Sequence, residues 1–386
     1  MFKRLLFPLL CTTIILIASC NKDPEFTYSF YTPEEMQVLS QHLTLPEKPD
    51  DYTVHLPQNL VNAGLRASAI DQNKAVLGRV LFYDKRLSKD GTISCASCHK
   101  QEIGFSDDKR VSTGVYGRLG SRNAIALASV ASFAAYYGTD INGSSAIRFF
   151  WDNRAPTASE QNKGSLANPA EMDMHMNEVV EVVRSQPYYQ PLLRKAFGNS
   201  DVTADQMNEA IAHFVNSMGS YKSKFDEEAS KGGLVTSPFP GFTESENHGK
   251  SIYMNNCAKC HSYEMGRPYL FYASNGIDAG LTNDNGVGSI SGITEQMGCF
   301  KVPALRNIAL TAPYMHDGRF QTLAEVVEHY NSGIQNHPNL HYRLKENGAP
   351  KRMNLSESDK QDLINFLHTL TDPHFIVDPR FSNPFK

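Results

Sequence analysis

Several features of common protein classes are missing from this chain of 386 residues. Positive charge is not in excess, because 37 Lys and Arg against 41 Asp and Glu leave a net charge of -4, which argues against a nucleic-acid partner. Disorder and a polytopic membrane protein are also excluded, since 41% hydrophobic and 20% charged residues are typical of a folded soluble protein. The length allows two domains, each with its own core.

Cysteine is scarce outside two short motifs. Of the seven cysteines, Cys11 and Cys20 lie in an N-terminal apolar segment, and four others form two closely spaced pairs. Cys299 is left over, so the sequence does not predict the disulfide framework of a small exported protein. We expect Cys299 to be a buried thiol that packs as a small hydrophobic residue.

The first 20 residues have the pattern of a processing signal. Lys3 and Arg4 precede the apolar run "LLFPLLCTTIILIA", which is too short to span a bilayer, and "IASC" places small residues before Cys20. This ending resembles a bacterial lipoprotein signal, in which Cys20 is lipidated and becomes the first mature residue. An ordinary secretory signal or an uncleaved anchor is the alternative. We expect an exported, periplasmic protein that contacts the membrane through an N-terminal lipid only.

The two cysteine pairs share one motif. Its residues are Cys95, Cys98 and His99 in "CASCH", and Cys257, Cys260 and His261 in "CAKCH". Two thiols at this spacing can add to the vinyl groups of haem, and the adjacent histidine is then placed to bind the iron. Zinc would need further soft ligands nearby, which neither motif has. The sequence therefore predicts two covalently bound c-type haems with these histidines as proximal ligands.

A longer repeat surrounds the two motifs. "LGRVLFYD" (from Leu77) precedes the first and "HGKSIYMN" (from His248) precedes the second, each with Gly, a basic residue and an aromatic residue in the same order. The stretch "ASKGGLVTSPFPGF", rich in Gly, Pro and Ser, separates the modules. The expected organisation is a signal peptide (1–20), an N-terminal extension or tether (21–49), a first haem domain (50–230), a linker (231–242), a second haem domain (243–375) and a tail (376–386).

Helical patterns dominate the rest of the chain. Segments beginning at Thr203, Thr243 and Ser356 have N-terminal caps and apolar residues at 3.6-residue spacing, whereas few stretches alternate as strands do. Long connections rich in Gly, Asn and Ser separate the helices. We expect a mainly α fold of two cytochrome c-like haem domains in tandem, with long loops.

The segment "TLAEVVEHYNSG" predicts one short helix. Thr322 and Glu325 form a capping box, and "NSG" gives the stop. Four residues at i, i+3, i+4 and i+7 form its expected buried stripe: Leu323, Val326, Val327 and Tyr330. From periodicity alone, Tyr330 is a core aromatic residue.

Five motifs together carry a family resemblance. "CASCH", "FWDNRAPTASEQ", "NPAEM", "CAKCH" and "VPALRNIALTAPYMHDGRF" occur in this order. With them the chain resembles the dihaem bacterial cytochrome c peroxidase family, which includes MauG, over roughly residues 50–372. The resemblance implies that the N-terminal haem is the peroxidatic one and that the C-terminal haem transfers electrons.

Three catalytic residues are implied by this resemblance. Glu171 matches the glutamate on the distal face of the peroxidatic haem, where a carboxylate can move the protons of peroxide cleavage. Gln161 matches the residue that orients the distal pocket, and Trp151 matches the tryptophan between the haems. Without the resemblance, Glu171 would be expected as an exposed turn carboxylate and Trp151 as a core residue.

A calcium ion between the haems is also implied. Its protein ligands match the side chain of Asn123 and the backbone carbonyls of Thr311 and Pro313, with waters completing an oxygen shell. By itself, Asn123 would be expected only as a loop cap.

Two positions depart from the usual peroxidase pattern. Val115, in the loop "VSTGVYGRLGSRN", stands where many members have a histidine that blocks the peroxidatic iron, so we expect a five-coordinate or water-bound first haem that needs no reductive activation. Tyr330 stands where peroxidases have a methionine ligand to the second haem, and MauG has tyrosine there. A phenolate ligand lowers the haem potential, whereas a thioether raises it. The alternative ligands are His329, Met315, Met297 and Met265.

The leading functional prediction is a peroxidase that reduces hydrogen peroxide to water with electrons from a donor cytochrome c or similar small protein. A MauG-like oxidase or maturase, which uses high-valent haem iron to oxidise a protein substrate, is the alternative favoured by Tyr330 and the missing histidine. A dihaem electron carrier without catalytic activity would leave Glu171 and Gln161 without a purpose. The expected partners are peroxide, an electron-donor protein and, in a homodimer, a second copy of the chain.

Overall fold

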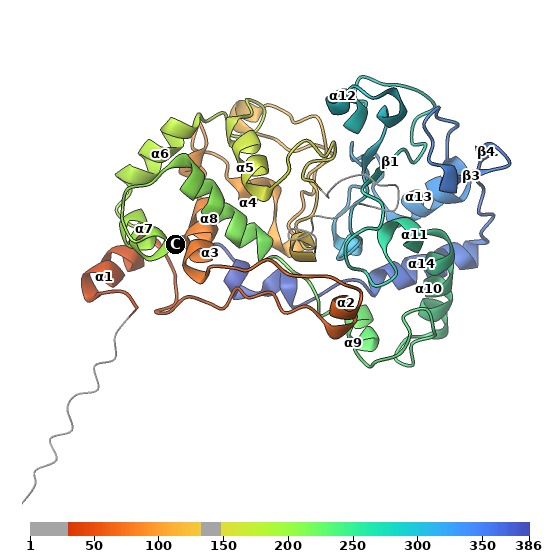
Figure 1. The fold of residues 1–386 in the computed structure, drawn as a ribbon, viewed down its shortest axis with the longest axis horizontal. Coiled ribbons are helices and arrows are strands. Elements are labelled where there is room, and N and C mark those ends of the chain that lie inside the picture. Colours follow the sequence, from red (N-terminus) through yellow and green to blue (C-terminus); the bar gives the residue numbers. More distant parts are fainter. Residues whose placement is uncertain (1–29, 133–147) are drawn as a thin grey trace, which may run out of the picture.

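The computed structural model describes residues 30–132 and 148–386, which fold into two neighbouring lobes (Figure 1). The expected signal peptide and Cys20 lie outside the described residues. Within the described ranges, no helix combines the length and the apolar character needed to cross a membrane. Helices joined by long loops make up most of both lobes, which confirms the expected mainly α fold.

Short helices and very short strands are connected by loops and 3₁₀ turns. Residues 30–229 form α1 (Pro33–His42), α2 (Gln58–Asn62), α3 (Gln72–Tyr83), α4 (Cys95–Cys98), α5 (Ala158–Ala167), α6 (Met176–Ser185), α7 (Tyr189–Phe197), α8 (Ala204–Asn216) and α9 (Lys224–Ala229). Residues 230–386 form α10 (Glu244–Asn256), α11 (Ala258–His261), α12 (Val287–Ser291), α13 (Leu323–Glu328) and α14 (Glu357–His368). Two antiparallel pairs complete the fold, β1 (Tyr272–Ala273) with β2 (Phe300–Lys301), and β3 (Lys345–Glu346) with β4 (Ala349–Pro350).

Three of the expected helices begin where their caps predicted. Thr203, Thr243 and Ser356 are the N-caps of α8, α10 and α14, and each closes a reciprocal capping box with the third residue of its helix. These bonds satisfy backbone N–H groups that a helix start otherwise leaves unpaired.

Each lobe has its own hydrophobic core. The first is built largely on α3, α7 and α8, and includes Phe82 and Phe214. The second is built largely on α10 and α14, and includes Tyr253 and Phe366. Cys95 packs against the first core and Cys257 against the second, so each cysteine motif lies beside one core.

The glycines of the sequence repeat allow two equivalent helix crossings. A Cβ atom added at Gly78 in α3 would lie 2.0 Å from the backbone oxygen of Ala210 in α8. A Cβ atom added at Gly249 in α10 would lie 1.9 Å from the backbone oxygen of Asp362 in α14. A larger side chain would force the backbones apart, so the repeat is explained by close contact of one helix pair in each lobe.

The cores divide the chain at points that differ from the expected domain boundaries. Phe225 lies in the expected first domain and Phe239 in the expected linker, yet both are buried in the second core. Phe375 and Phe381, at the end of the expected second domain and in its tail, are buried in the first core. The difference has a physical reason: large aromatic side chains gain free energy by burying apolar area, so they pack into whichever core they can reach.

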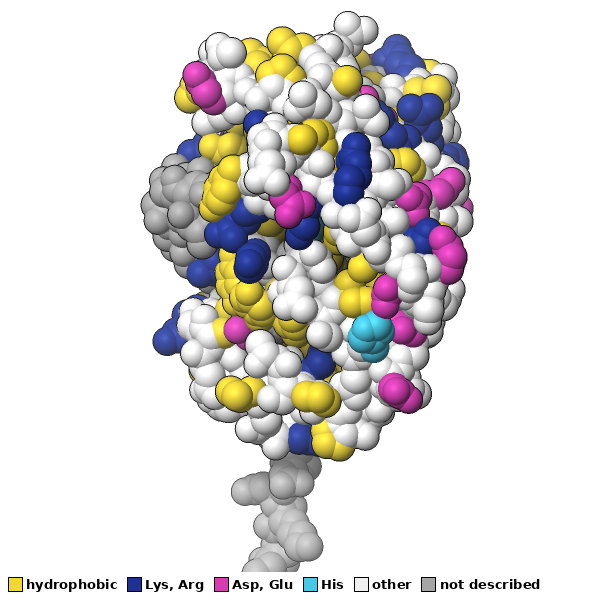
Figure 2. Space-filling model, turned by 90° about the vertical axis from the view of Figure 1, so that its right-hand side faces the viewer, with side chains coloured by type: hydrophobic (Ala, Val, Ile, Leu, Met, Phe, Trp, Pro, Cys, Tyr) yellow, Lys and Arg dark blue, Asp and Glu magenta, His cyan; other side chains and the backbone are white. Residues whose placement is uncertain are grey.

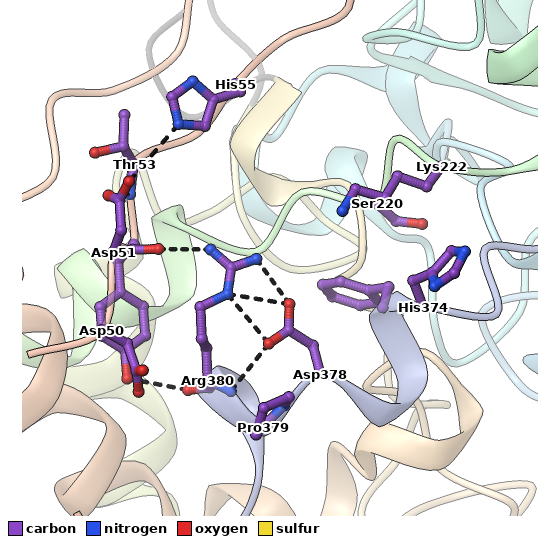
Figure 3. Close-up of polar contacts among 12 residues, drawn as sticks. Asp50, Asp51, Thr53, His55, Ser220, Lys222, His374, Asp378, Pro379 and Arg380 are labelled. Carbon is purple, nitrogen blue, oxygen red and sulfur yellow. Dashed lines mark hydrogen bonds and ion pairs between the residues drawn. The ribbon is translucent and has the colours of Figure 1, made fainter. Parts of the chain in front are cut away.

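The end of the chain returns to the first lobe, where it is hydrogen-bonded to residues from the N-terminal part of the chain (Figure 3). Arg380 donates to the backbone oxygen of Asp51 at 2.5 Å and forms an ion pair with Asp378 at 2.7 Å. Tyr52 donates from its hydroxyl group to the backbone oxygen of Arg380 at 3.0 Å. Further along, the backbone N–H of Thr44 donates to the oxygen of Pro384, which places the C-terminus beside α1 (Figure 1).

Candidate functional site

A cavity of about 690 Å³ extends through both lobes. Every residue that we expected to bind haem, iron or calcium or to act in catalysis lines it: Cys95, Cys98, His99, Asn123, Trp151, Gln161, Glu171, Cys257, Cys260, His261, Thr311, Pro313 and Tyr330. Arg343 and Lys351, beside the β3–β4 hairpin, also line it. In the view onto the second lobe, hydrophobic side chains are visible in a hollow bordered by Lys and Arg side chains (Figure 2).

The first motif presents a histidine whose free nitrogen is defined by its hydrogen bond. α4 contains both cysteines of "CASCH" and ends directly before His99. The Nδ1 atom of His99 lies 2.9 Å from the backbone oxygen of Phe105 and therefore carries the proton, which leaves Nε2 as a ligand. Burial lowers the pKa of His99, which favours the neutral form that binds metal.

The second motif repeats this arrangement. The Nδ1 atom of His261 lies 2.9 Å from the backbone oxygen of Pro303, so Nε2 is again left as a ligand. Burial lowers the pKa of His261 and raises the pKa of the Cys257 thiol to about 12. The donor set of each motif, two thiols and a neutral imidazole in a large apolar cavity, fits a covalently bound haem.

A polar cluster surrounds Glu171 in the first lobe. Asn168 donates from Nδ2 to Oε1 of Glu171 at 2.7 Å, and Ser165 donates a second hydrogen bond to the same carboxylate. Gln161 donates from Nε2 to Oγ of Ser165 at 2.9 Å. Burial raises the pKa of Glu171, and the hydrogen bonds from Ser165 and Asn168 partly oppose this shift. Glu171 is therefore a half-buried carboxyl group. It is not the exposed turn residue that the sequence predicts without the family resemblance.

Ser165 was missed in the sequence, although a signal for it exists. Gln161 and Ser165 are four residues apart on α5 and so share one face of that helix. Nothing in the sequence shows that this face meets the turn before Glu171, which is a tertiary contact.

The loop that contains Val115 is packed against the turn of Glu171. The backbone N–H of Val115 donates to the backbone oxygen of Glu171 at 2.9 Å, and the Val115 side chain is fully buried. A Cβ atom at Gly114 would lie 2.2 Å from the backbone oxygen of Ala170, so the approach is close. Among the described residues, the histidines that line the cavity are His99, His261 and His316.

Trp151 lines the cavity and is hydrogen-bonded to both lobes. Its Nε1–H donates to the backbone oxygen of Asn123 at 2.8 Å, and its own backbone oxygen accepts from the N–H of Lys301 in β2 at 2.7 Å. Asn123 in turn donates from Nδ2 to the backbone oxygen of Lys109 at 3.1 Å, which leaves its Oδ1 as the oxygen for a cation. Within residues 30–132 and 148–386, no group of three or more His, Cys, Asp or Glu residues could hold a metal ion. A calcium site formed by the Asn123 side chain and backbone carbonyls would use neutral oxygens.

The segment around Tyr330 has most of the structure that its sequence predicts. Thr322 caps α13 and forms the predicted capping box with Glu325. The four stripe residues Leu323, Val326, Val327 and Tyr330 all line the cavity. The structure differs at the end, because His329–Gly333 form a π-helical turn instead of continuing α13. Such turns are frequent at functional sites.

The phenol of Tyr330 is in polar contact inside the cavity. Asn275 donates from Nδ2 to the Tyr330 hydroxyl oxygen at 3.3 Å, and burial raises the pKa of Tyr330 to about 12. The Sδ atom of Met315 lies 3.6 Å from the same Nδ2 atom. Asn275 was another residue that we did not identify from the sequence.

The alternative ligands to the second haem differ in their access to the cavity. Of the four alternatives, Met315 lines the cavity, while His329, Met297 and Met265 are not among the described residues that line it. The Nε2 atom of His329 bonds to the backbone oxygen of Asn275 at 3.2 Å. Cys299 is buried as expected, and burial raises the pKa of its thiol to about 11.

Comparisons with known proteins agree with this double site. Residues 72–232 match the family model for di-haem cytochrome c peroxidase, and residues 247–371 match the model for cytochrome c. The methylamine utilization protein MauG of Methylorubrum extorquens is 32% identical over 327 residues, which cover 82% of this chain and 83% of MauG. The cytochrome c551 peroxidase of Nitrosomonas europaea is 35% identical over 264 residues, which cover 66% of this chain and 71% of that relative.

Comparison with a solved structure supports the same family for the fold. The crystal structure of a MauG-like protein associated with microbial copper homeostasis superposes with a TM-score of 0.66 at 31% identity, covering 88% of this chain and 99% of that one. Together the matches confirm two cytochrome c domains in tandem, which imply bound haem c and export to the periplasm. The relatives divide between MauG proteins and cytochrome c peroxidases. The chain belongs to the dihaem cytochrome c peroxidase and MauG family.

Proposed function

We propose that this protein is a peroxidase that reduces hydrogen peroxide to two water molecules at the first haem site, with two protons and with two electrons from a small donor protein. The observation that carries the proposal is the half-buried carboxyl group of Glu171, held by Asn168 and Ser165 in the cavity that also contains His99. When bound, the two haems supply the electron-transfer chemistry. The chain itself supplies proton transfer, orientation and access.

Glu171 is the proposed proton carrier. Its carboxylate would accept the proton of the near peroxide oxygen and return it to the oxygen that leaves as water. Because burial raises its pKa toward the working pH, the group can both take up and release a proton. Asn168 and Ser165 hold the carboxylate in one orientation, and Gln161 orients Ser165 by its amide hydrogen bond.

Val115 keeps the first site open in this proposal. Its short apolar side chain cannot bind iron, and its backbone bond to Glu171 holds the loop against the polar cluster. We therefore propose that the oxidised protein reacts with peroxide without prior reduction.

Trp151 is the proposed relay for electrons between the two sites. Its indole lines the cavity, and its two backbone-directed hydrogen bonds tie it to Asn123 on one side and to Lys301 on the other. Asn123, Thr311 and Pro313 are the proposed calcium ligands, since all three line the same cavity and offer neutral oxygens. We expect about one calcium ion per chain by elemental analysis. Wild-type protein without calcium would contradict this assignment.

Tyr330 is the proposed second ligand of the C-terminal haem. Its position in the cavity, with an amide donor at its oxygen, supports ligation, and His329 is directed to a backbone carbonyl instead. A phenolate ligand stabilises ferric iron, so this site should have a lower potential than a His/Met site.

A MauG-like oxidase or maturase is the second candidate. The same Tyr330 favours it, together with the 32% identity to MauG of Methylorubrum extorquens. In that case a protein substrate would donate the electrons.

One experiment separates these functions. Purified oxidised protein is mixed with hydrogen peroxide and then with reduced cytochrome c, and the oxidation of the cytochrome is followed by absorbance. We expect rapid turnover, which Glu171→Gln should lower by about 10²- to 10⁴-fold while both haems stay bound. The matched control is Glu160→Gln. It removes an exposed carboxylate on α5, where Glu160 forms an ion pair with Lys163. Persistent turnover in Glu171→Gln would refute its role, and a long-lived oxidised intermediate with poor cytochrome oxidation would favour the MauG-like function.

We also propose that Cys20 carries a lipid. Mass spectrometry of protein extracted from the membrane fraction should find a diacylated N-terminus, and Cys20→Ala should shift the protein to the soluble periplasmic fraction. An unmodified Cys20 in the mature protein would contradict this anchor.

A further inference from the structure

One side chain amide contacts the ligand candidates of the second haem site. Asn275 follows β1, lines the cavity and donates from Nδ2 to the Tyr330 oxygen at 3.3 Å. The same Nδ2 atom lies 3.6 Å from Sδ of Met315. Its backbone oxygen accepts from Nε2 of His329 at 3.2 Å. Asn275 is thus bonded to both residues that begin the π-helical turn.

The orientation of this amide is defined by a second bond. The Oδ1 atom of Asn275 accepts from the backbone N–H of Ile277 at 3.2 Å. A flipped amide would place its NH₂ group against that N–H, so the oxygen faces Ile277 and the NH₂ group faces Tyr330.

The first haem site contains the same device. The Oδ1 atom of Asn168 accepts from the backbone N–H of Ala170 at 3.0 Å, and its Nδ2 donates to the Glu171 carboxylate at 2.7 Å. In both sites an asparagine bonds to the N–H two residues ahead, which turns its amide donors toward the functional oxygen.

We propose that Asn275 is a positioning residue of the second haem site: its amide holds the phenol oxygen of Tyr330 in place and weakens that oxygen as a donor to iron. The inference rests on the proposed ligand role of Tyr330 and deepens it. A hydrogen bond to the ligand oxygen draws electron density from it, so ferric iron is stabilised less than by an unassisted phenolate. Asn275 therefore raises the potential of the second haem and keeps Tyr330, and not Met315, as its ligand.

The backbone around Asn275 is held independently of its side chain. The N–H of Gln335 donates to the oxygen of Gly276 at 2.7 Å, and a Cβ atom at Gly276 would lie 2.6 Å from the oxygen of Gln335. The loop after β1 is thus anchored next to the segment that follows the π-helical turn. Substitution of the Asn275 side chain should leave this anchor in place.

The test uses Asn275→Asp and Asn275→Ala in the full dihaem protein. Asn275→Asp keeps an acceptor for Ile277 but removes the donor to Tyr330, and Asn275→Ala removes both. Absorbance and electron paramagnetic resonance spectra identify the ligand of the second haem, and a potentiometric titration gives its potential. As long as Tyr330 remains the ligand, we expect both variants to lower the reduction equilibrium constant of that haem by about tenfold, or about 59 mV. A thioether-type spectrum with a raised potential in Asn275→Ala would instead show that Tyr330 has lost its place to Met315, which supports the positioning part of the proposal.

Two further variants make the outcomes distinguishable. Asn247→Ala is the structural control, since Asn247 pins the Phe239 loop through two hydrogen bonds and does not line the cavity among the described residues. It should change stability without changing the second haem's spectrum or potential. If Tyr330→Phe alters the spectrum but both Asn275 variants keep the wild-type spectrum and potential, the positioning role of Asn275 is refuted. The ligand assignment of Tyr330 is then unaffected. If Tyr330→Phe also leaves the spectrum unchanged, the ligand assignment under the proposed function fails.

Discussion

The two cysteine motifs hold their histidines in the same way, whereas the other functional candidates differ between the lobes. His99 and His261 each bond through Nδ1 to a backbone oxygen at 2.9 Å; His99 directly follows α4, and His261 is the last residue of α11. Among the other residues that line the cavity, the first lobe has the polar cluster of Glu171, whereas the second has the phenol of Tyr330. The repeated part of the chain thus contains the residues proposed to attach the cofactor. The segments outside the repeat determine what each cofactor can do.

The largest expected effect is a separation of the two sites by single substitutions. Glu171→Gln should lower peroxide turnover by about 10²- to 10⁴-fold and leave the spectrum of the second haem unchanged. Tyr330→Phe should change the spectrum and raise the potential of the second haem, while the first haem still reacts with peroxide. Stopped-flow absorbance measures both. If Glu171→Gln altered the second haem, or Tyr330→Phe abolished the first reaction with peroxide, the two sites would not have the separate roles inferred above.

The next prediction concerns what the sites share. Gly78→Ala and Gly249→Ala should each destabilise the protein by about 1–3 kcal/mol, because the new Cβ atom would overlap a backbone oxygen of the facing helix. Thermal unfolding followed by circular dichroism measures the change. Gly233→Ala and Gly280→Ala are matched controls, since a Cβ atom there meets nothing within 4 Å. An equal loss of stability in the controls would show that the crossings are not the cause.

A smaller effect is expected from Ser165→Ala. Ser165 donates to the Glu171 carboxylate and so lowers its pKa against the effect of burial. Without that bond the pKa of Glu171 rises, fewer molecules carry the carboxylate, and the acidic limb of the kcat/KM profile moves to higher pH. We expect a loss of less than about tenfold on that limb. The control Ser185→Ala, in which an exposed serine of α6 is replaced, should leave the profile in place. An unshifted limb in Ser165→Ala would mean that this hydroxyl does not act on Glu171.

The smallest effect is on stability. Because burial raises the folded-state pKa of Glu171, the folded protein binds this proton more tightly than the unfolded chain does. Stability from this group is therefore present below the ordinary pKa of a glutamate and is lost as the pH rises through the raised value. Glu171→Gln removes the ionisation, so it should raise Tm by about 1–3 °C at pH 8 and have little effect at pH 4. Calorimetry at pH 4 and pH 8 measures the Tm of both proteins. A lower Tm of Glu171→Gln than of the wild type at pH 8 would contradict the prediction.

The sequence predicted those parts of both sites that depend on local pattern. The cysteine motifs, the capping boxes at Thr203, Thr243 and Ser356, and the stripe that turns Tyr330 toward the cavity all follow from spacing along one segment. Gln161, Glu171 and Asn123 were named through family resemblance, and the structure places them in the same cavity.

Contacts between distant segments could not be predicted in this way. Asn275 meets Tyr330 from a position 55 residues earlier in the chain, and Ser165 meets Glu171 only because a turn folds back on α5. The same reason explains the core boundaries. Neither composition nor periodicity shows that Phe381 packs in the first lobe, at 6.0 Å between ring centroids from Phe214.

The returning C-terminal segment has a consequence for how the protein is made. Phe375 and Phe381 complete the first core, and Arg380 is clasped by residues near position 51, yet this segment leaves the ribosome and the export machinery after both cysteine motifs. The second core needs no residue beyond Leu370 and can close earlier. The first lobe must therefore stay partly open until residues 375–381 have been made, although domains usually fold in order from the N-terminus. We expect that interval to keep Cys95 and Cys98, the proposed attachment residues, accessible while haem is attached.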